Sequence, residues 1–513
     1  MNKYNQIFDD KNNPFSKDVI KLAIEFDKAT LENDLVKIEE LIKEAQIQLT
    51  VENEASQAYL FYSLGTVYSD VSKLKGISDE ESLKKQIYYY RKSLKILGKE
   101  KFFDQRYSPY ILGLKEILIT NYANSLFECG RIIAAIEQYK TVLALHNGFG
   151  MALGNLGRVY QHYAMLEYDE THRDILHSAA YKCFTHALVC NDPNTHQNAR
   201  MLFQSRIDQY DSDYVERVLK PEWKFPEFSY DNPDEYAYRK WCLNRGLFLN
   251  TLNDLTIDSS SFMADVIQLP EMITDINSKP IFHGMYSQLK QEYIYARYLF
   301  YCAQHPYDKP HYADKNTYIV AYTDYTQYSI RLEKVKTALK TLFGLFDKIA
   351  FFLNSYFDLE INEYDISFRS VWQKEAGHGK KKYHYKNTLN PKKNYALSSL
   401  CWISKDFYET FEDSPNPELK RIKEIRNALV HKYVKIYDTF TEPDIEKMGD
   451  GLALYISENE LFEVTMQLIK ILRESIICLS LCVNIAEKQK KDENKNKLIY
   501  PMPLWTYEDD WKV

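Results

Sequence analysis

The sequence predicts an all-α protein in which an N-terminal solenoid of helical repeats is followed by a C-terminal helical bundle. Apolar residues recur at three- and four-residue spacing along most of the 513 residues, and glycine and proline number only 16 each. A chain of this length exceeds one ordinary core. We expect a repeat domain over 1–210, a connecting region over 211–320 that partly extends the bundle, the bundle over 321–495 and a tail over 496–513.

Composition and charge describe a globular chain with 45% apolar and 27% charged residues. The net charge of −7 argues against a basic nucleic-acid coat, so any surface that binds nucleic acid must be a local patch. Eight scattered cysteines fit a reducing compartment. The first residues lack an apolar signal segment, and the longest apolar run, SIICLSLCVNIA, is too short to cross a bilayer. We therefore expect a cytoplasmic protein without a membrane segment.

Repeated units follow a helical hairpin over 18–48 that breaks at Asn33 and Asp34. Units start near Leu64, Tyr122 and Leu156, and the last two starts are 34 residues apart, the tetratricopeptide period. Small residues should let paired helices approach while aromatic residues fill the space opposite. The first and third units carry about nine and eleven extra residues between their helices. The concave face of such a solenoid commonly holds a peptide or protein, and a scaffold without a ligand is the alternative.

Proline then interrupts the helical pattern. The run VLKPEWKFPEFSYDNPDEY holds Pro221, Pro226 and Pro233, and it is the expected domain boundary. Helical patterns resume over 236–252 and 287–304, before a loop that reads HPYDKPHYADKN. His305, Asp308 and His311 in that loop lack a shared helix face, and no phosphate loop, HExxH or EF-hand pattern occurs. We expect no metal and no cofactor.

Four amphipathic helices are expected to form the C-terminal bundle. The third contains the segment IRNALVHKY, and the other three have apolar seams at Leu332, Val335, Leu339, Leu342, Phe346, Ile349 and Leu353; at Ala396, Leu400, Ile403, Phe407 and Phe411; and at Leu461, Val464, Leu468, Ile471, Cys478, Cys482 and Ile485.

The third helix should begin at Asn416 and Pro417, with its seam at Leu419, Ile422, Leu429, Tyr433, Ile436 and Phe440. Arg426 occupies a seam position, where a guanidinium must be paired or used. Arg426 and His431 lie roughly 140° apart on an ideal helix, so one helix alone does not make them partners. The simplest interpretation is a salt-bridged Arg426 and a solvated His431.

This segment resembles the Arg-x4-6-His signature of the HEPN superfamily (higher eukaryotes and prokaryotes nucleotide-binding), in which a polar residue, here Asn427, follows the arginine. The phrases YAYRKWCLNRGLFLNTLNDL, FDKIAFFLNSYF and NYALSSLCWISKDF resemble a prokaryotic HEPN branch with N-terminal helical repeats, over roughly residues 230–490.

The resemblance implies a metal-independent endoribonuclease that dimerises through the bundle so that two motifs face one cleft. His431 would move protons, Arg426 would hold the phosphate, Asn427 would position either group, and Glu424 is a weaker candidate for orienting the site. Such proteins often act as toxins or antiviral effectors, here with a protein or peptide trigger on the repeats. The alternative is a non-catalytic HEPN dimerisation module joined to a repeat adaptor. A nucleotide-binding transferase is weaker, since no phosphate loop occurs.

A basic loop over 374–393, KEAGHGKKKYHYKNTLNPKK, carries seven lysines against one acid. Lysines that track phosphates, with tyrosines that stack on bases, make it a candidate RNA-binding surface. The candidate RNA-binding residues are Lys380, Lys381, Lys382, Tyr383, Tyr385 and Lys386. A solvated loop is the alternative. In the tail, Trp505 and Trp511 predict docking on another surface.

Overall fold

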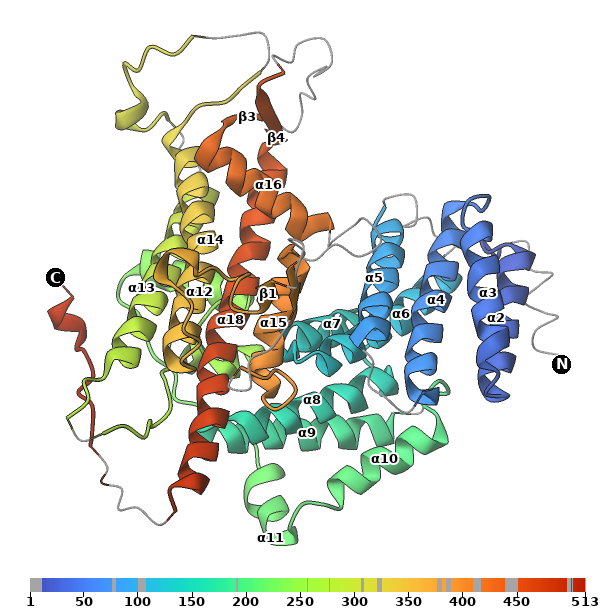
Figure 1. Ribbon diagram of the computed structural model, residues 1–513. Coiled ribbons are helices and arrows are strands. Elements are labelled where there is room, and N and C mark those ends of the chain that lie inside the picture. Colours follow the sequence, from blue (N-terminus) through green and yellow to red (C-terminus); the bar gives the residue numbers. More distant parts are fainter. Residues whose placement is uncertain are drawn as a thin grey trace.

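The computed structural model describes residues 12–75, 80–99, 108–190, 192–255, 257–275, 277–305, 309–320, 325–375, 381–383, 389–408, 417–438, 451–495, 500 and 502–512. Helices dominate these residues, and the strands among them are short, which confirms the all-α prediction. The N-terminal helices lie on one side of the molecule and the C-terminal bundle on the other (Figure 1).

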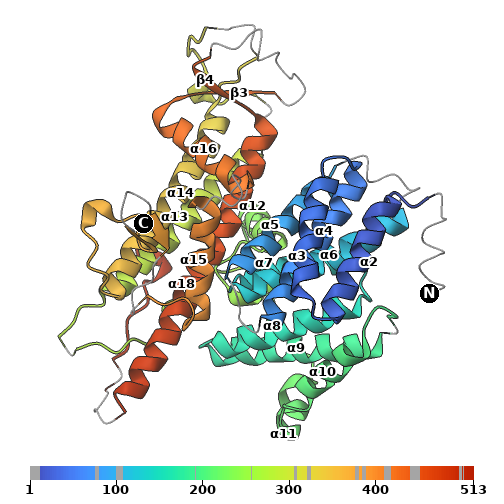
Figure 2. The same cartoon turned by 45° about the vertical axis from the view of Figure 1, so that its right-hand side comes forward.

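The N-terminal region consists of antiparallel helices, each packed against the next in the chain. Figure 2 shows α2 to α7 side by side, with α8 and α9 beneath them. Their bounds are α2 Lys17–Leu31, α3 Leu35–Gln48, α4 Glu54–Leu74, α5 Glu80–Leu97, α6 Ser108–Glu128, α7 Ile132–Leu145, α8 Gly150–Leu166, α9 Glu170–Val189 and α10 Gln197–Ile207.

Glycine permits close packing within two of these helix pairs. A Cβ on Gly65 would lie 2.4 Å from the Tyr90 ring, and one on Gly157 would lie 2.9 Å from the Phe184 ring. These are the small and aromatic positions that the repeat pattern predicts. The extra residues of the third unit do not form a loop, because Glu170 to Ser178 lie within α9. The N-terminal region is thus a stack of helix pairs consistent with repeats.

The connecting region combines helices with irregular segments. It contains α11 Ser212–Tyr214, the π-helix η3 Val215–Leu219, α12 Pro233–Asn244, the 3-10 helices η4 Thr251–Asp254 and η5 Ser260–Phe262, and α13 Ile281–Gln304. Between Lys220 and Asn232 the chain forms no helix or strand, as the three prolines indicate. The domain boundary placed there stays a prediction.

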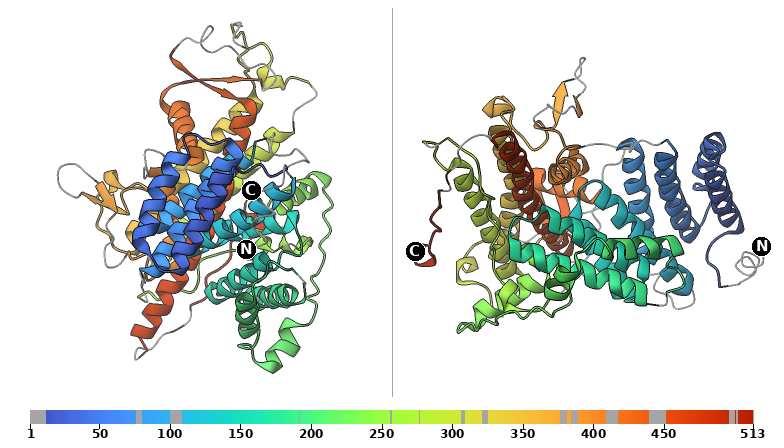
Figure 3. Two further views of the ribbon diagram at one scale, coloured as in Figure 1. Left: turned by 90° about the vertical axis from the view of Figure 1, so that its right-hand side faces the viewer. Right: turned by 90° about the horizontal axis from the view of Figure 1, so that it is seen from below.

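The C-terminal bundle is built around α18 Glu458–Glu493, which packs against α13, α14 Ile330–Tyr356, α15 Tyr395–Tyr408 and α16 Pro417–His431. The predicted apolar positions of α14 and α15 that are described are all buried, as are those of α18 except the half-buried Ile485. Short helices η6 Tyr312–Asp314 and η7 Glu363–Asp365 lie in the loops, and a hairpin of β1 Gln373–Glu375 and β2 Lys381–Tyr383 projects from the bundle (Figure 3).

The third helix is shorter than its apolar spacing predicts, because α16 ends at His431. Residues Tyr433–Tyr437 form β3, which pairs in parallel with β4 Ala453–Ser457. The prediction of a helical seam through Tyr433 and Ile436 was therefore wrong. Aromatic and β-branched residues in YVKIY favour a strand once a partner strand is available, and spacing within one segment does not reveal that partner. Phe440 lies outside the described residues.

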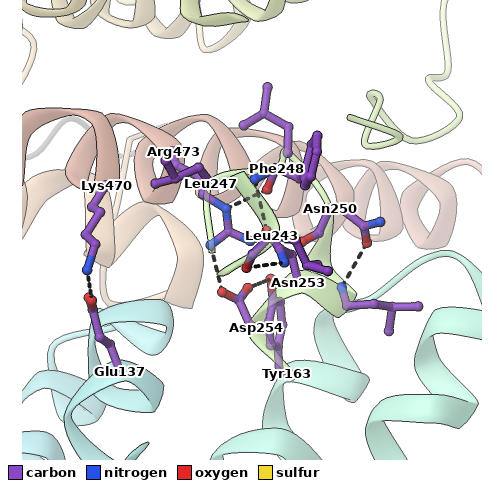
Figure 4. A network of polar contacts seen from close by, with 12 residues as sticks. Glu137, Tyr163, Leu243, Leu247, Phe248, Asn250, Asn253, Asp254, Lys470 and Arg473 are labelled. Carbon is purple, nitrogen blue, oxygen red and sulfur yellow. Dashed lines mark hydrogen bonds and ion pairs between the residues drawn. The ribbon is translucent and has the colours of Figure 1, made fainter. Parts of the chain in front are cut away.

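Buried ion pairs join the N-terminal region to the bundle. Arg473 of α18 donates to Asp254 at 2.7 Å, and Tyr163 of α8 donates to the same carboxylate at 3.2 Å (Figure 4). Arg131 of α7 donates to both carboxylate oxygens of Glu474 on α18, at 2.9 and 2.8 Å. The two regions therefore form one packed body.

The tryptophans of the tail do not dock on this chain, since Trp505 is 94% exposed and Trp511 is 54% exposed. Docking on another molecule stays a prediction. The short helix η8 Asp509–Trp511 closes with contacts inside the tail, where Tyr507 donates to the carbonyl of Trp511. Among the described residues, no helix is long and apolar enough to span a membrane.

Candidate active site on α16

Helix α16 presents its motif residues at the edge of the bundle. Ile422, Ile425 and Ala428 are buried, and they anchor the helix against α14, α15 and α18. Arg426 is half-buried beside this apolar stripe, whereas His431 is exposed as the last helical residue. The buried stripe thus fixes Arg426 in place and leaves His431 open to solvent.

Arg426 is held without a salt bridge among the described residues. Its Nη1 donates to Oδ1 of Asn427 at 3.0 Å, and its guanidinium lies 4.9 Å from the centre of the Phe343 ring on α14. The interpretation of Arg426 as a salt-bridged seam residue therefore finds no support within the described chain. The remaining N–H groups of the Arg426 guanidinium can donate hydrogen bonds to a ligand.

A partly buried acid faces this guanidinium. Burial raises the pKa of Asp347 on α14, while the backbone N–H of Phe368, at 3.0 Å, and the charge of Arg426 oppose that rise. Burial also raises the pKa of the nearby Tyr408 phenol, and the charge of Arg426 only partly offsets that rise. Tyr408 therefore stays neutral, and the negative charge of Asp347 is disfavoured.

Two more cations gather on the Tyr408 ring at the end of α15. Lys423 Nζ lies 4.6 Å from the ring centre and the Arg369 guanidinium 5.9 Å. Burial, followed by the charge of Arg369, lowers the pKa of Lys423. We call Asp347, Arg369, Tyr408, Lys423 and Arg426 the α16 cluster. Tyr408 links these groups, because Lys423 and Arg369 lie over its ring and the charges of Asp347 and Arg426 act on its phenol. Three cations near one carboxylate whose negative charge is disfavoured make a site that favours an anion.

Comparison with family models identifies the domain that contains the α16 cluster. Residues 273–486 match the model described as LA2681-like HEPN. This part of the chain is a HEPN domain. It includes α13 to α16 and most of α18, and hence both Arg426 and His431. Comparisons of the whole chain with curated proteins and with solved structures gave no match.

HEPN domains are generally associated with ribonuclease activity, which agrees with the anion-favouring α16 cluster. Asn427 contacts Arg426 directly, as a positioning role requires. Glu424 is exposed and forms an ion pair of 3.8 Å with Arg421. Arg421 in turn binds Glu460 at 2.6 Å. Glu424 thus belongs to an ion-pair network with Arg421 and Glu460.

Four residues of the α16 cluster escaped the sequence analysis, namely Asp347, Arg369, Tyr408 and Lys423. Asp347 carries a visible signal, because it interrupts the apolar stretch between Phe346 and Ile349 of α14. Arg369 and Tyr408 carry none, since each comes from a different segment of the chain. Among the described residues, no group of three His, Cys, Asp or Glu gathers as a metal site would require.

The candidate RNA-binding residues lie only partly within the described chain. Lys381, Lys382 and Tyr383 form β2, whereas Lys380, Tyr385 and Lys386 lie outside the described residues. Gln373, the first residue of β1, pairs with Tyr383 and accepts a hydrogen bond of 2.7 Å from Arg369. The base of this hairpin therefore adjoins the α16 cluster of the HEPN domain.

Proposed function

We propose that this chain is a metal-independent endoribonuclease of the HEPN type. The observation that carries the proposal is the α16 cluster within a HEPN domain, where Arg426 keeps free donors and Lys423 and Arg369 lie over the neighbouring Tyr408 ring. A phosphodiester supplies the anion that these cations lack. Lys381 and Lys382, on the hairpin beside Arg369, would extend contact along the RNA backbone.

RNA carries its own nucleophile, so the protein need only move protons and stabilise charge. The 2′-oxygen attacks the adjacent phosphorus, the bond from phosphorus to the 5′-oxygen breaks, and the products are a 2′,3′-cyclic phosphate and a 5′-hydroxyl. His431 takes the proton of the 2′-hydroxyl or returns one to the leaving oxygen. Arg426 offsets the charge on the non-bridging oxygens, and Asn427 holds the guanidinium in place.

A homodimer would complete this site, since Arg426 and His431 point apart on one helix. His431 is exposed at the end of α16 and is free to enter a cleft formed with a second copy. Light scattering should report a dimer at micromolar concentration. A monomer that cleaves RNA at full rate would contradict the shared site.

Control by the N-terminal region completes the proposal, with the chain acting as a toxin or antiviral effector that responds to a protein or peptide trigger. Arg131 and Arg91 of this region bind the bundle directly, so a trigger there can act on the HEPN domain. Deleting residues 1–210 should change toxicity in cells. An unchanged phenotype, with the bundle folded and expressed, would remove the regulatory role.

The deciding experiment incubates the pure full-length chain with total RNA in EDTA and maps the cleaved ends. We expect cleavage to persist and to leave 2′,3′-cyclic phosphates, and Arg426→Ala and His431→Ala each to abolish it. Lys420→Ala, an exposed change on the same helix, is the matched control. A strict requirement for magnesium would overturn the mechanism. A folded dimer without any cleavage would favour the adaptor function.

A further inference from the structure

A large cleft opens between parts of the N-terminal region and the bundle, and Arg426 does not line it. Its volume is about 1230 Å³. One wall is formed by α5, α6 and α7, and the other by the loop that contains η4, the end of α15, the start of α16 and the middle of α18. Residues of the floor form the ion pairs between Lys470 and Glu137 and between Arg473 and Asp254 (Figure 4).

The cleft is basic in an acidic protein. Eleven lysines and arginines line it against five acids, whereas the whole chain has a net charge of −7. Two arginines of the floor are already paired with carboxylates, since Arg91 and Arg131 share Asp406 and Arg131 also binds Glu474. Lys92, Lys95 and Lys140 have no carboxylate partner among the described residues. Arg245 of the lining contacts the Trp241 carbonyl and ring, so the cations without a carboxylate partner are mostly lysines.

Lys140 makes the strongest case for an absent anion. Lys140 is half-buried on α7, and burial lowers the pKa of its amine. The charge of Arg473 lowers this pKa further, whereas the charges of Asp254 and Glu137 oppose the shift. Its amine has no hydrogen-bond or ion-pair partner within the described residues. Removing an ammonium from water without a partner costs free energy, which a carboxylate bound in the cleft would recover.

The shape of the charged wall fits an extended chain. Lys84, Lys92 and Lys95 line the cleft from one helix, α5, and the stretch from Lys84 to Lys95 spans about 16 Å at the helical rise per residue. That length matches about five residues of extended peptide. Apolar side chains stand between the cations, including Ile87 and Leu94. Charged and apolar groups of an acidic peptide would both find partners.

The aromatic residues of the cleft argue against a nucleic acid here. Bases bind single-strand sites by stacking on open rings. Lys92 covers Tyr88 at 5.4 Å, Arg91 covers Tyr122 at 5.8 Å and Lys405 covers Trp402 at 4.6 Å. These rings are occupied by cations, so the aromatic residues of the lining offer no open face for a base.

We infer that this cleft binds an extended acidic peptide segment of a partner protein. Its occupant would touch both regions, because Lys95 belongs to α5 while Leu419 belongs to the first turn of α16. Asp406 lies in the same lining, two residues before Tyr408 of the α16 cluster. Binding can therefore alter the position of α15 and α16. The regulatory role rests on the proposed ribonuclease function, whereas the binding does not.

The test starts from the full-length chain and a displayed library of random twelve-residue peptides. We expect the selected peptides to be rich in Asp and Glu with interspersed apolar residues. A fluorescein-labelled selected peptide should bind the variant Lys92→Glu/Lys95→Glu at least tenfold more weakly in anisotropy titrations. Lys95→Glu alone, at an exposed residue, should weaken binding in the same direction. Lys43→Glu on α3, outside the cleft, is the matched control and should bind as the parent chain does.

Selected peptides without acidic enrichment, or equal affinity for the cleft variants, would overturn the inference. If a ten-nucleotide adenylate RNA displaces the peptide and loses affinity in the same variants, the cleft is a nucleic-acid site and the peptide assignment is wrong. The anisotropy measurement does not depend on RNA cleavage. A peptide that binds the cleft without changing the cleavage rate would refute only its regulatory role.

Discussion

Replacing Arg426 by alanine separates a catalytic guanidinium from a structural one. The change removes one hydrogen bond to Asn427 and one cation–π contact with Phe343. Each is worth roughly 0.5 to 1 kcal/mol in a half-exposed setting, so the fold should lose about 1 to 2 kcal/mol. A preorganised donor aimed at developing charge is worth on the order of 100- to 1000-fold in rate. That rate loss corresponds to about 3 to 4 kcal/mol of transition-state stabilisation, whereas the stability loss should leave the variant folded.

The assay measures initial rates of cleavage of a labelled single-stranded RNA in EDTA, together with thermal melting of each variant. Arg426→Ala should melt within a few degrees of the parent and cleave at least 100-fold more slowly. Arg426→Lys keeps the charge but lacks the planar guanidinium, so its cleavage rate should lie between those of the parent chain and Arg426→Ala. Lys420→Ala should behave as the parent does. Arg426→Ala with a rate within threefold of the parent would refute the role of the guanidinium.

Three further predictions concern stability and binding. Asp406→Asn should cost about 3 to 5 kcal/mol in urea unfolding, because it leaves Arg91 and Arg131 without their shared carboxylate, whereas the exposed pair broken by Glu137→Gln should cost below about 1 kcal/mol. Burial alone would raise the pKa of Asp406, but the two arginines hold that pKa below its ordinary value. The stabilisation by Asp406 is therefore present above about pH 3.9 and is lost as the pH falls through the lower pKa of the folded state. Equal costs for Asp406→Asn and Glu137→Gln would contradict this account. Asp347→Asn should raise the melting temperature at pH 7 and leave it unchanged at pH 3. The pKa of Asp347 is raised in the folded protein, so the parent chain loses stability as the pH rises through that pKa and the carboxylate becomes charged. A gain of equal size at pH 7 and at pH 3 would exclude this cause. Neutralising Lys380, Lys381 and Lys382 together should weaken RNA binding and flatten its salt dependence by about two units, at roughly 0.7 per phosphate contact, and an unchanged slope would show a merely solvated loop.

Local sequence patterns predicted the helices well where each helix buries one continuous stripe. The 3-4 spacing of α14 predicted the buried positions from Leu332 to Leu353, since such spacing brings side chains to one face whatever the partner is. The break at Asn33 was also readable, because Asn33 takes the left-handed conformation, with φ of 56°, that asparagine tolerates. The same argument failed after His431, where pairing with a distant strand decided the structure.

The sequence by itself determined the helical class, the small and aromatic packing positions and the presence of Arg426, Asn427 and His431 on one segment. These depend on residue type and short-range spacing. Only the tertiary structure decided that Asp347, Arg369, Lys423 and Arg426 gather near Tyr408, because α14, the loop after it, α15 and α16 each contribute to that cluster. It also decided that Lys140 faces a cleft between the two regions. Desolvation and charge interactions depend on neighbours in space, and spacing along the chain does not encode them.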